Sequence, residues 1–228
     1  MARGFEFSIG EWYHCFSRGV EKRTTYEDKT DYDRFLSLLY LANTDAPVTL
    51  FNQRKAHSLS DSLAIERGGT ITTIGAYCLM PNHYHLILKE EVEGGISKFM
   101  QKVGTGYTMY FNTRYKRTGN LFIGPFRAQH IADDKYLQRV IRYVHINPAE
   151  LIEPKWKYGK VSDMRELKKR IVTYPYSSLK DYANSNSPTR HLLGHEVFEI
   201  YEPVSTASML EDALDYYKGQ NIEVSPQY

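Results

Sequence analysis

The sequence lacks the long apolar segments that mark membrane and exported proteins. No apolar run approaches the roughly 20 residues that a membrane-spanning helix needs. Residues 1–10 contain no apolar core of the kind found in secretory signal peptides. We therefore expect a cytoplasmic protein with no membrane partner.

Cysteine is scarce and charge is nearly balanced. The two cysteines, Cys15 and Cys78, lie in apolar, strand-like stretches, which predicts buried reduced thiols rather than a disulfide framework. The formal net charge is +2, from 29 basic and 27 acidic residues, so nucleic-acid binding would have to depend on local basic clusters. Tyrosine is abundant, with 19 copies, and suits both core packing and stacking on unpaired bases.

Hydrophobic periodicity predicts an α+β domain over residues 1–150. The expected order is strand, helix, strand, strand, helix, strand, helix, which favours an α+β sheet with helices packed on one face. The strands are expected at Trp12–Ser17, Ile71–Met80, His83–Lys89 and Phe126–Ile131, and the helices start near Asp31, Gly95 and Asp133 or Asp134.

The remaining segments carry weaker patterns. Val48–Phe51 is a short β-favouring run, and residues 52–69 are polar and predict a surface insertion. Prolines punctuate the chain after Pro148, with helical patches near Val161–Ile171 and Ala207–Tyr217. We expect residues 151–228 to form an extension packed on the core, and the sequence assigns it no role.

One segment combines two histidines with a strand pattern. Because side chains alternate along a strand, His83 and His85 share one face, about 7 Å apart, while Tyr84 points to the core. Two neutral imidazoles on one face can converge on a divalent cation. The alternative is a pair of surface or hydrogen-bonded histidines, and this motif alone does not choose between them.

A second motif lies in the third helix. Tyr143 and Asn147 are four residues apart and so share a helical face, whereas His145 points elsewhere. A hydroxyl and an amide oxygen can thus meet one site. The alternative is that Tyr143 is a core aromatic and Asn147 a helix terminator before Pro148.

Basic residues gather in two loops and at one further position. Lysine and arginine hold phosphate backbones, and nearby tyrosines offer stacking surfaces, although such a charge run is more often a solvated loop. The candidate DNA-binding residues are Arg18, Lys22, Arg23, Arg114, Lys116, Arg117 and Arg127.

The motifs together resemble those of a known family. Met80-Pro81-Asn82-His83-Tyr84-His85-Leu86-Ile87-Leu88 resembles the HUH motif (histidine, hydrophobic, histidine) of the single-tyrosine transposases of the insertion-sequence-200 type. Tyr143-Val144-His145-Ile146-Asn147-Pro148 is similar to the tyrosine motif of their REP-associated branch, and their spacing, from position 83 to position 143, also agrees. Arg18-Gly19, residues 111–115 and residues 119–122 extend the resemblance over about residues 10–150.

The resemblance implies a fold, a chemistry and a set of site residues. The fold would be a ferredoxin-like antiparallel sheet. The protein would be a metal-dependent single-stranded DNA endonuclease and strand transferase that recognises hairpins and forms a 5′-phosphotyrosine intermediate. By position, Tyr143 would be the nucleophile, and His83, His85 and Asn147 would bind Mg²⁺ or Mn²⁺.

Two departures from the family pattern, and two alternatives, accompany this interpretation. Ala149-Glu150 follows Pro148 where the family often has a basic residue, and Val20 replaces a common polar residue.

The first alternative is a domesticated hairpin-binding protein or regulator without productive transposition. The second, a metal hydrolase of small substrates, would need a carboxylate beside the histidines, and the sequence offers none. The sequence leaves open a monomer or a homodimer.

Overall fold

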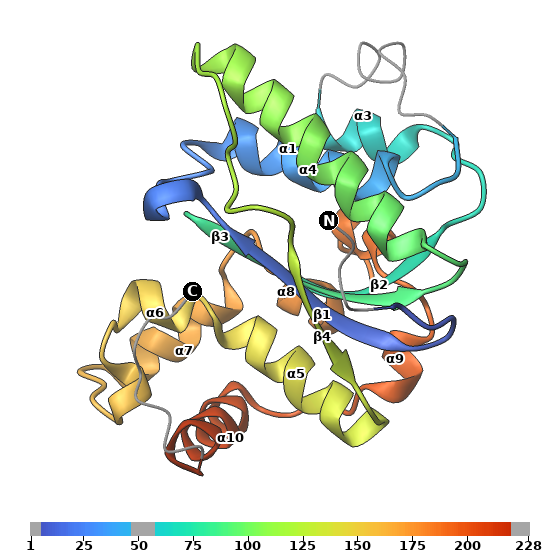
Figure 1. Cartoon of the computed structure of the whole chain (residues 1–228). Coiled ribbons are helices and arrows are strands. Elements are labelled where there is room, and N and C mark those ends of the chain that lie inside the picture. The colour runs from blue at the N-terminus through green and yellow to red at the C-terminus, as the bar shows by residue number, and fades with distance from the viewer. Residues whose placement is uncertain (1–5, 47–57, 220–228) are drawn as a thin grey trace.

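The computed structural model describes residues 6–46 and 58–219, and four antiparallel strands form its centre (Figure 1). The strands are β1 (Trp12–Arg18), β2 (Thr72–Met80), β3 (His83–Glu90) and β4 (Arg127–Ile131), in the spatial order β2-β3-β1-β4. Helix α1 (Lys29–Leu41) connects β1 to β2, and α4 (Gly95–Arg114) connects β3 to β4. This is the ferredoxin-like order, so the predicted α+β fold is confirmed.

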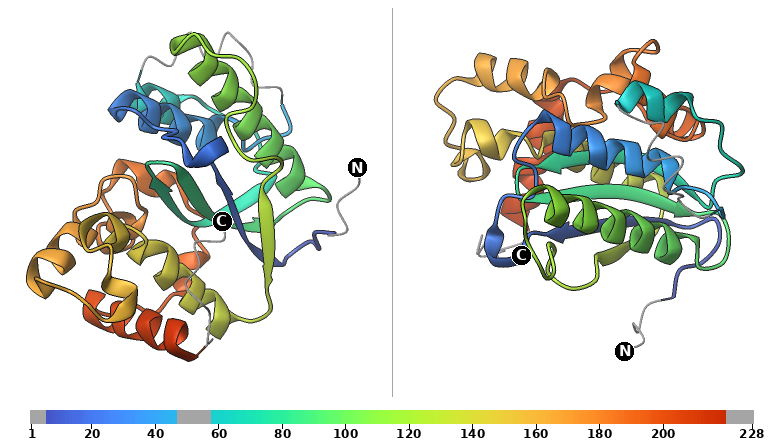
Figure 2. Two further views of the ribbon diagram at one scale, coloured as in Figure 1. Left: turned by 60° about the vertical axis from the view of Figure 1, so that its left-hand side comes forward. Right: turned by 90° about the horizontal axis from the view of Figure 1, so that it is seen from above.

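Helices α1 and α4 cover one face of the sheet (Figures 1 and 2). Alternation along β3 sends Tyr84, Leu86 and Leu88 to this face, where all three are buried. Phe35 of α1 and Tyr107 of α4 pack against each other at 5.1 Å between ring centroids, and Phe35 also contacts Tyr84. This layer forms the main hydrophobic core.

Helix α5 (Asp134–Ile146) packs on the opposite face, against β2, β3 and β4 (Figure 1). The Asp133 side chain caps it by accepting a hydrogen bond from the Tyr136 backbone amide. The expectation of helices on one face therefore holds for the ferredoxin-like core but not for the whole chain. An apolar stripe shows that a helix packs on a sheet, but not on which side.

Helix α1 begins at Lys29, just before the predicted start near Asp31. Asp28, not Asp31, accepts hydrogen bonds from the backbone amides at the start of this helix. Asp31 is fully buried and instead forms an ion pair with Arg114 at 2.7 Å, while the hydroxyls of Tyr110 and Tyr115 donate to it. Helices α1 and α4 are thus tied together by a buried carboxylate.

The described segment after α5 consists of four helices of four to nine residues and one longer helix, and it packs on α5 and along the β2 edge (Figure 1). Its backbone meets β2, since the Leu79 amide donates to the Tyr176 carbonyl and the Ser178 amide donates to the Tyr77 carbonyl. The Ser178 hydroxyl also accepts a hydrogen bond from the Tyr77 backbone amide, and the Tyr77 hydroxyl donates one to the Asp181 carboxylate. The helices are α6 (Ala149–Ile152), α7 (Met164–Val172), α8 (Leu179–Ala183), α9 (Val197–Ile200) and α10 (Thr206–Gly219), with 3₁₀ turns η2 (Trp156–Tyr158) and η3 (Pro188–Leu192).

Other expectations have mixed outcomes. The polar segment 52–69 contains a helix that its sequence pattern did not indicate, α3 (Leu59–Ala64), which begins with a Ser58 capping box and packs on α1. The run Val48–Phe51 lies outside the described residues. Cys15 and Cys78 are both buried and form no disulfide. None of the helices in the described ranges has the length and apolar character to cross a membrane.

Candidate active site

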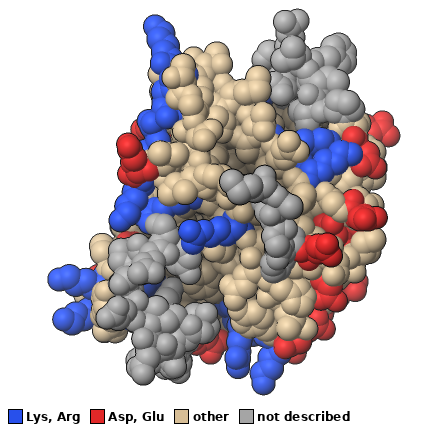
Figure 3. Space-filling view, viewed as in Figure 1, with Lys and Arg blue, Asp and Glu red and all other residues tan. Residues whose placement is uncertain are grey.

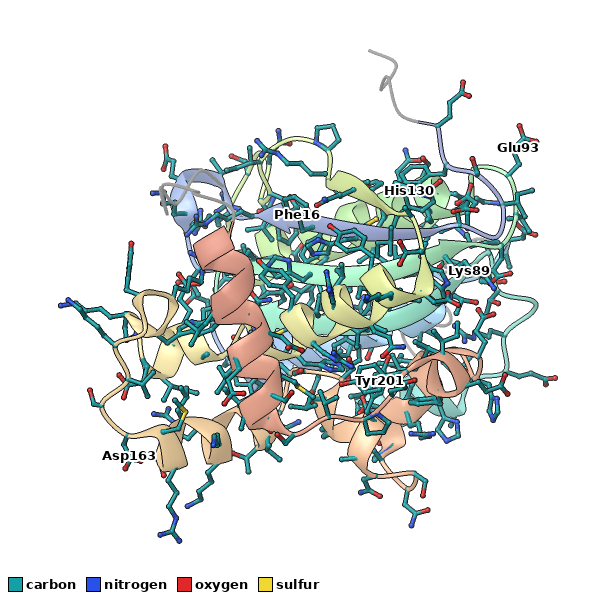
Figure 4. All side chains as sticks on the ribbon, turned by 90° about the horizontal axis from the view of Figure 1, so that it is seen from below. Phe16, Lys89, Glu93, His130, Asp163 and Tyr201 are labelled. Carbon is teal, nitrogen blue, oxygen red and sulfur yellow. The ribbon has the colours of Figure 1, made fainter. Side chains whose placement is uncertain are left out.

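Strand β3 places the two histidines of the first motif side by side under α5. His83 and His85 lie on the sheet face opposite Tyr84, and their ring centroids are 5.1 Å apart at nearly a right angle. Figure 4 views the molecule from below and labels Phe16, which lies on β1. Two imidazoles at this separation are close enough to bind a single cation.

Each imidazole has its Nδ1 atom engaged by the protein. His83 Nδ1 lies 2.7 Å from Asn82 Oδ1, and His85 Nδ1 lies 2.8 Å from His14 Nε2. The Nε2 atoms are therefore the ring nitrogens available to a ligand. Asn82 is itself fixed, because its amide nitrogen donates to the Lys22 carbonyl at 3.1 Å.

His14 is a site residue that the sequence did not reveal. It lies on β1, is buried, and contacts both the His85 ring and the Tyr143 ring, at 5.1 and 5.9 Å between centroids. A lone histidine in a strand carries no motif. Only the pairing of β1 with β3 brings these positions together, and that pairing joins residues 71 positions apart.

Helix α5 brings Tyr143 to the histidines. The Tyr143 ring meets His85 edge-on, at 5.7 Å between centroids. Asn147 follows one turn later as the C-terminal cap of α5, is buried, and donates its amide nitrogen to the Tyr143 carbonyl at 2.9 Å. Its amide oxygen is thus the atom that can act as a ligand.

His145 points away from the site, as its place in the helix predicts. It is fully buried, its Nε2 lies 2.9 Å from the Ser178 hydroxyl, and its ring packs edge-on against Tyr182. Because Ser178 also bonds to β2, His145 fastens α5 to both the sheet and the C-terminal segment. This contact holds the helix that carries Tyr143.

Burial keeps the three histidines of the site neutral. It lowers the pKa of His14 to about 4 and, together with the positive charge of Arg18, lowers the pKa of His83 to about 4. Burial and the neighbouring His14 and His83 rings place the pKa of His85 well below its ordinary value. Neutral imidazole is the form that binds metals, so these rings are ready as ligands at neutral pH.

The donors fit a divalent cation held by two imidazoles and an amide oxygen. Imidazole nitrogen suits transition metals, whereas an amide oxygen suits Mg²⁺ or Mn²⁺, and water or phosphate oxygens can complete the coordination of either ion. Across residues 6–46 and 58–219, no three His, Cys, Asp or Glu side chains are grouped to hold a metal. A metal site here would therefore need a donor of another kind besides the two imidazoles.

Two of the candidate DNA-binding residues share the face of the histidines. Arg18 pairs directly with His83 across β1 and β3, and Phe16 pairs with both His85 and Arg127. Directly paired residues of neighbouring strands point to the same side of a sheet. Arg18 and Arg127 therefore flank the two imidazoles.

The two basic loops meet beside this face. Arg23 and Arg117 both lie over the ring of Phe111, at 5.8 and 5.9 Å from its centroid. Lys22 and Lys116 are exposed and both have left-handed backbone conformations. Arg114 differs from the other basic residues, because it forms ion pairs with Asp28 and Asp31 that balance its charge.

The charge distribution over the surface agrees with this convergence. Lysine and arginine line the left-hand edge of the molecule in Figure 3, where Figure 1 has 3₁₀ turn η1 (Val20–Lys22) and the C-terminal end of α4. Aspartate and glutamate concentrate on the right-hand side (Figure 3). The basic edge adjoins the histidines through Asn82, which bonds to both Lys22 and His83.

The C-terminal segment adds a charged pair near the histidines. Lys157, in η2, forms an ion pair of 2.9 Å with Glu150. The charge of Lys157 lowers the pKa of both His83 and His85, and that of Glu150 raises the pKa of His83. The pair therefore places two opposite charges near His83.

Acid is expected to destabilise the fold through its buried histidines. Burial lowers the pKa of His145 to about 3, whereas an unfolded histidine titrates near 6.5. Both states are neutral above pH 6.5, but the unfolded state alone takes up the proton as the pH falls below it. At pH 5 this costs about 2 kcal/mol of stability for His145.

Urea unfolding at pH 7.5 and pH 5.0 measures this loss. His145→Gln keeps an amide that can bond to Ser178 but cannot titrate, so its loss between the two pH values should be about 2 kcal/mol smaller. Equal losses in the parent and in the variant would contradict the assignment to His145.

A comparison with known protein families points in the same direction. Residues 51–147 match the family described as "Transposase IS200 like", and this span includes His83, His85, Tyr143 and Asn147. Among solved structures, a REP-associated tyrosine transposase bound to a REP hairpin is similar at 17% identity and a TM-score of 0.47, covering 90% of this chain and 98% of its own. No curated protein matches. The family match confirms the resemblance carried by the two motifs.

Proposed function

Because residues 51–147 match the IS200-like transposase family, we propose that the protein is a metal-dependent single-stranded DNA endonuclease and strand transferase. The observation that carries the proposal is the contact between Tyr143 and His85, on the sheet face that also holds His83. A tyrosine packed against a neutral imidazole places a potential nucleophile next to a potential metal ligand, which phosphotyrosine chemistry at a metal site requires.

In the proposed reaction, Tyr143 is the nucleophile. Its hydroxyl oxygen bonds to the scissile phosphorus and loses its proton, the bond from phosphorus to the 3′-oxygen breaks, and that oxygen takes up a proton. The products are a 5′-phosphotyrosine link and a free 3′-hydroxyl. Attack by a 3′-hydroxyl on the link reverses these steps, so strand joining needs no external energy source.

The metal ligands in this proposal are His83, His85 and Asn147. A bound Mg²⁺ or Mn²⁺ would polarise the scissile phosphate and stabilise the charge that develops on it. The protein holds the imidazoles neutral by burial and orients Asn147 through its bond to the Tyr143 carbonyl. The same helix turn thus positions both the nucleophile and a ligand.

Cationic side chains around the site would hold the DNA backbone. Arg18 and Arg127 share the face of the histidines, so these two are placed to contact phosphates next to the cut. The basic edge formed by Lys22, Arg23, Lys116 and Arg117 would hold a hairpin stem. We assign Arg114 a structural role, because Asp28 and Asp31 balance its charge.

The lysines of the basic edge give a test of hairpin binding. Replacing Lys22 and Lys116 together by alanine is expected to weaken hairpin binding. The slope of log binding constant against log salt concentration should become less steep by about one unit for each lysine removed. Cleavage at saturating DNA should change little, because neither residue lies among the histidines. Binding isotherms at several salt concentrations measure both quantities.

The matched control replaces two exposed lysines at other helix ends. Lys98 and Lys135 lie in the first turns of α4 and α5, far from the ends that carry Arg114 and Asn147. Their double alanine variant should bind the hairpin as the parent does. An equal loss in both double variants would contradict a basic edge at Lys22 and Lys116.

The proposed function is tested with end-labelled hairpin oligonucleotides from the DNA that flanks the gene, with and without Mn²⁺. Denaturing gels should show a metal-dependent protein–DNA adduct that keeps the label 3′ of the cut. Hairpin binding without cleavage of any such substrate would contradict the proposal and favour a DNA-binding regulator.

A further inference from the structure

His14 forms a hydrogen bond with His85, one of the proposed metal ligands. The bond involves Nδ1 of His85, whereas Nε2 is the atom proposed to bind the metal. We propose that His14 is a positioning residue: its Nε2 accepts a hydrogen bond from Nδ1–H of His85 and holds that ring in the tautomer whose Nε2 lone pair faces the cation. This inference rests on the proposed function, because it assigns His85 as a ligand.

The contact has the geometry that such a role requires. His14 Nε2 and His85 Nδ1 are 2.8 Å apart, and both residues are buried. Residue 14 faces residue 87 across the β1–β3 pair, so His14 and His85 lie diagonally on one sheet face. The backbone pairing of the two strands thus fixes the position of the hydrogen bond, and neither ring can turn away without breaking it.

Two neutral rings leave two ways to place the protons, and only one of them supports metal binding. A neutral imidazole has one N–H and one lone pair. If His14 Nε2–H donates, His85 accepts on Nδ1 and carries its own proton on Nε2, which blocks the metal. If His85 Nδ1–H donates, its Nε2 lone pair is available.

The neighbouring ligand indicates which arrangement is correct. Asn82 donates its amide nitrogen to the Lys22 carbonyl, which leaves its Oδ1 facing His83 Nδ1 at 2.7 Å. An amide oxygen only accepts, so His83 must donate from Nδ1 and present its Nε2 lone pair. A cation at His83 Nε2 needs the same tautomer at His85, 5.1 Å away between ring centroids. Asn82 and His14 thus act as equivalent partners of the two ligands.

The test compares the parent with His14→Phe, which keeps a ring without an acceptor, and His14→Gln, which keeps an acceptor. Nitrogen-15 spectra of the metal-free protein report the tautomer of His85 directly. We expect Nδ1–H in the parent and in His14→Gln, and a mixture in His14→Phe. Mn²⁺ titration by calorimetry should show affinity about 10- to 100-fold lower in His14→Phe and largely restored in His14→Gln.

The outcomes separate this inference from the proposed function. An Nε2–H tautomer of His85 in the metal-free parent would overturn the role of His14, whatever the protein cleaves. Unchanged Mn²⁺ affinity and an unchanged tautomer in a folded His14→Phe would overturn it too. A parent with the expected tautomer that binds no Mn²⁺ would instead contradict the metal dependence in the proposed function. Circular dichroism establishes that each variant is folded.

Discussion

Replacing Tyr143 by phenylalanine is expected to abolish the covalent protein–DNA adduct. The substitution removes one oxygen atom and keeps the ring that packs against His14 and His85. Cleavage should fall by at least about 1,000-fold, the order of loss seen when a catalytic nucleophile is removed. Hairpin affinity, Mn²⁺ affinity and thermal stability should stay close to those of the parent.

Tyr136→Phe is the matched control for this prediction. Tyr136 lies on the same helix two turns earlier, and its hydroxyl accepts a hydrogen bond from Gln129 at 3.0 Å. The variant loses the same atom from a tyrosine that makes no contact with the histidines among the described ring pairs, so its cleavage rate should match that of the parent. Labelled hairpin DNA on denaturing gels measures both variants. An adduct that persists in Tyr143→Phe would remove Tyr143 from its proposed role.

Removal of a metal ligand is expected to have the second large effect. His83→Ala takes away an imidazole that is only partly buried, so the fold should tolerate the change. Mn²⁺ affinity should fall by about 100-fold or more, which exceeds the loss expected when a residue that only hydrogen-bonds to a metal ligand is removed. Cleavage should fall with the affinity. Hairpin binding should persist, since the basic edge is unchanged.

Calorimetric Mn²⁺ titration and cleavage assays at several Mn²⁺ concentrations check this result. The control is His130→Ala, because His130 is exposed on β4 and bonds to Glu11 on the sheet edge. Metal binding and cleavage of the control should match the parent. A His83→Ala variant with full Mn²⁺ affinity and full cleavage would contradict a metal site at the histidine pair.

The local parts of the site are predictable from the sequence, because they depend on short periodicities. Alternation along a strand places His83 and His85 on one face, and a spacing of four places Tyr143 above Asn147 on one side of a helix. The turn at Pro81-Asn82 fixes the hairpin between β2 and β3. Each of these relations spans only a few residues.

The parts that were not predicted depend on long-range packing. His14 joins the site only through the register of β1 with β3, which no local pattern encodes. Helix α5 packs on the sheet face that α1 and α4 leave uncovered. Arg114 looked like a DNA contact in a basic loop, but the fold places two carboxylates, Asp28 and Asp31, beside it.

The most direct test of the central claim is to map the DNA attachment site by mass spectrometry. The adduct formed with Mn²⁺ and a cognate hairpin is digested with protease and nuclease, and the peptide that carries the residual nucleotide is sequenced. The chain contains 19 tyrosines, and the account predicts a 5′-phosphate ester on Tyr143 alone. A nucleotide attached to any other tyrosine, or to a serine, would contradict it.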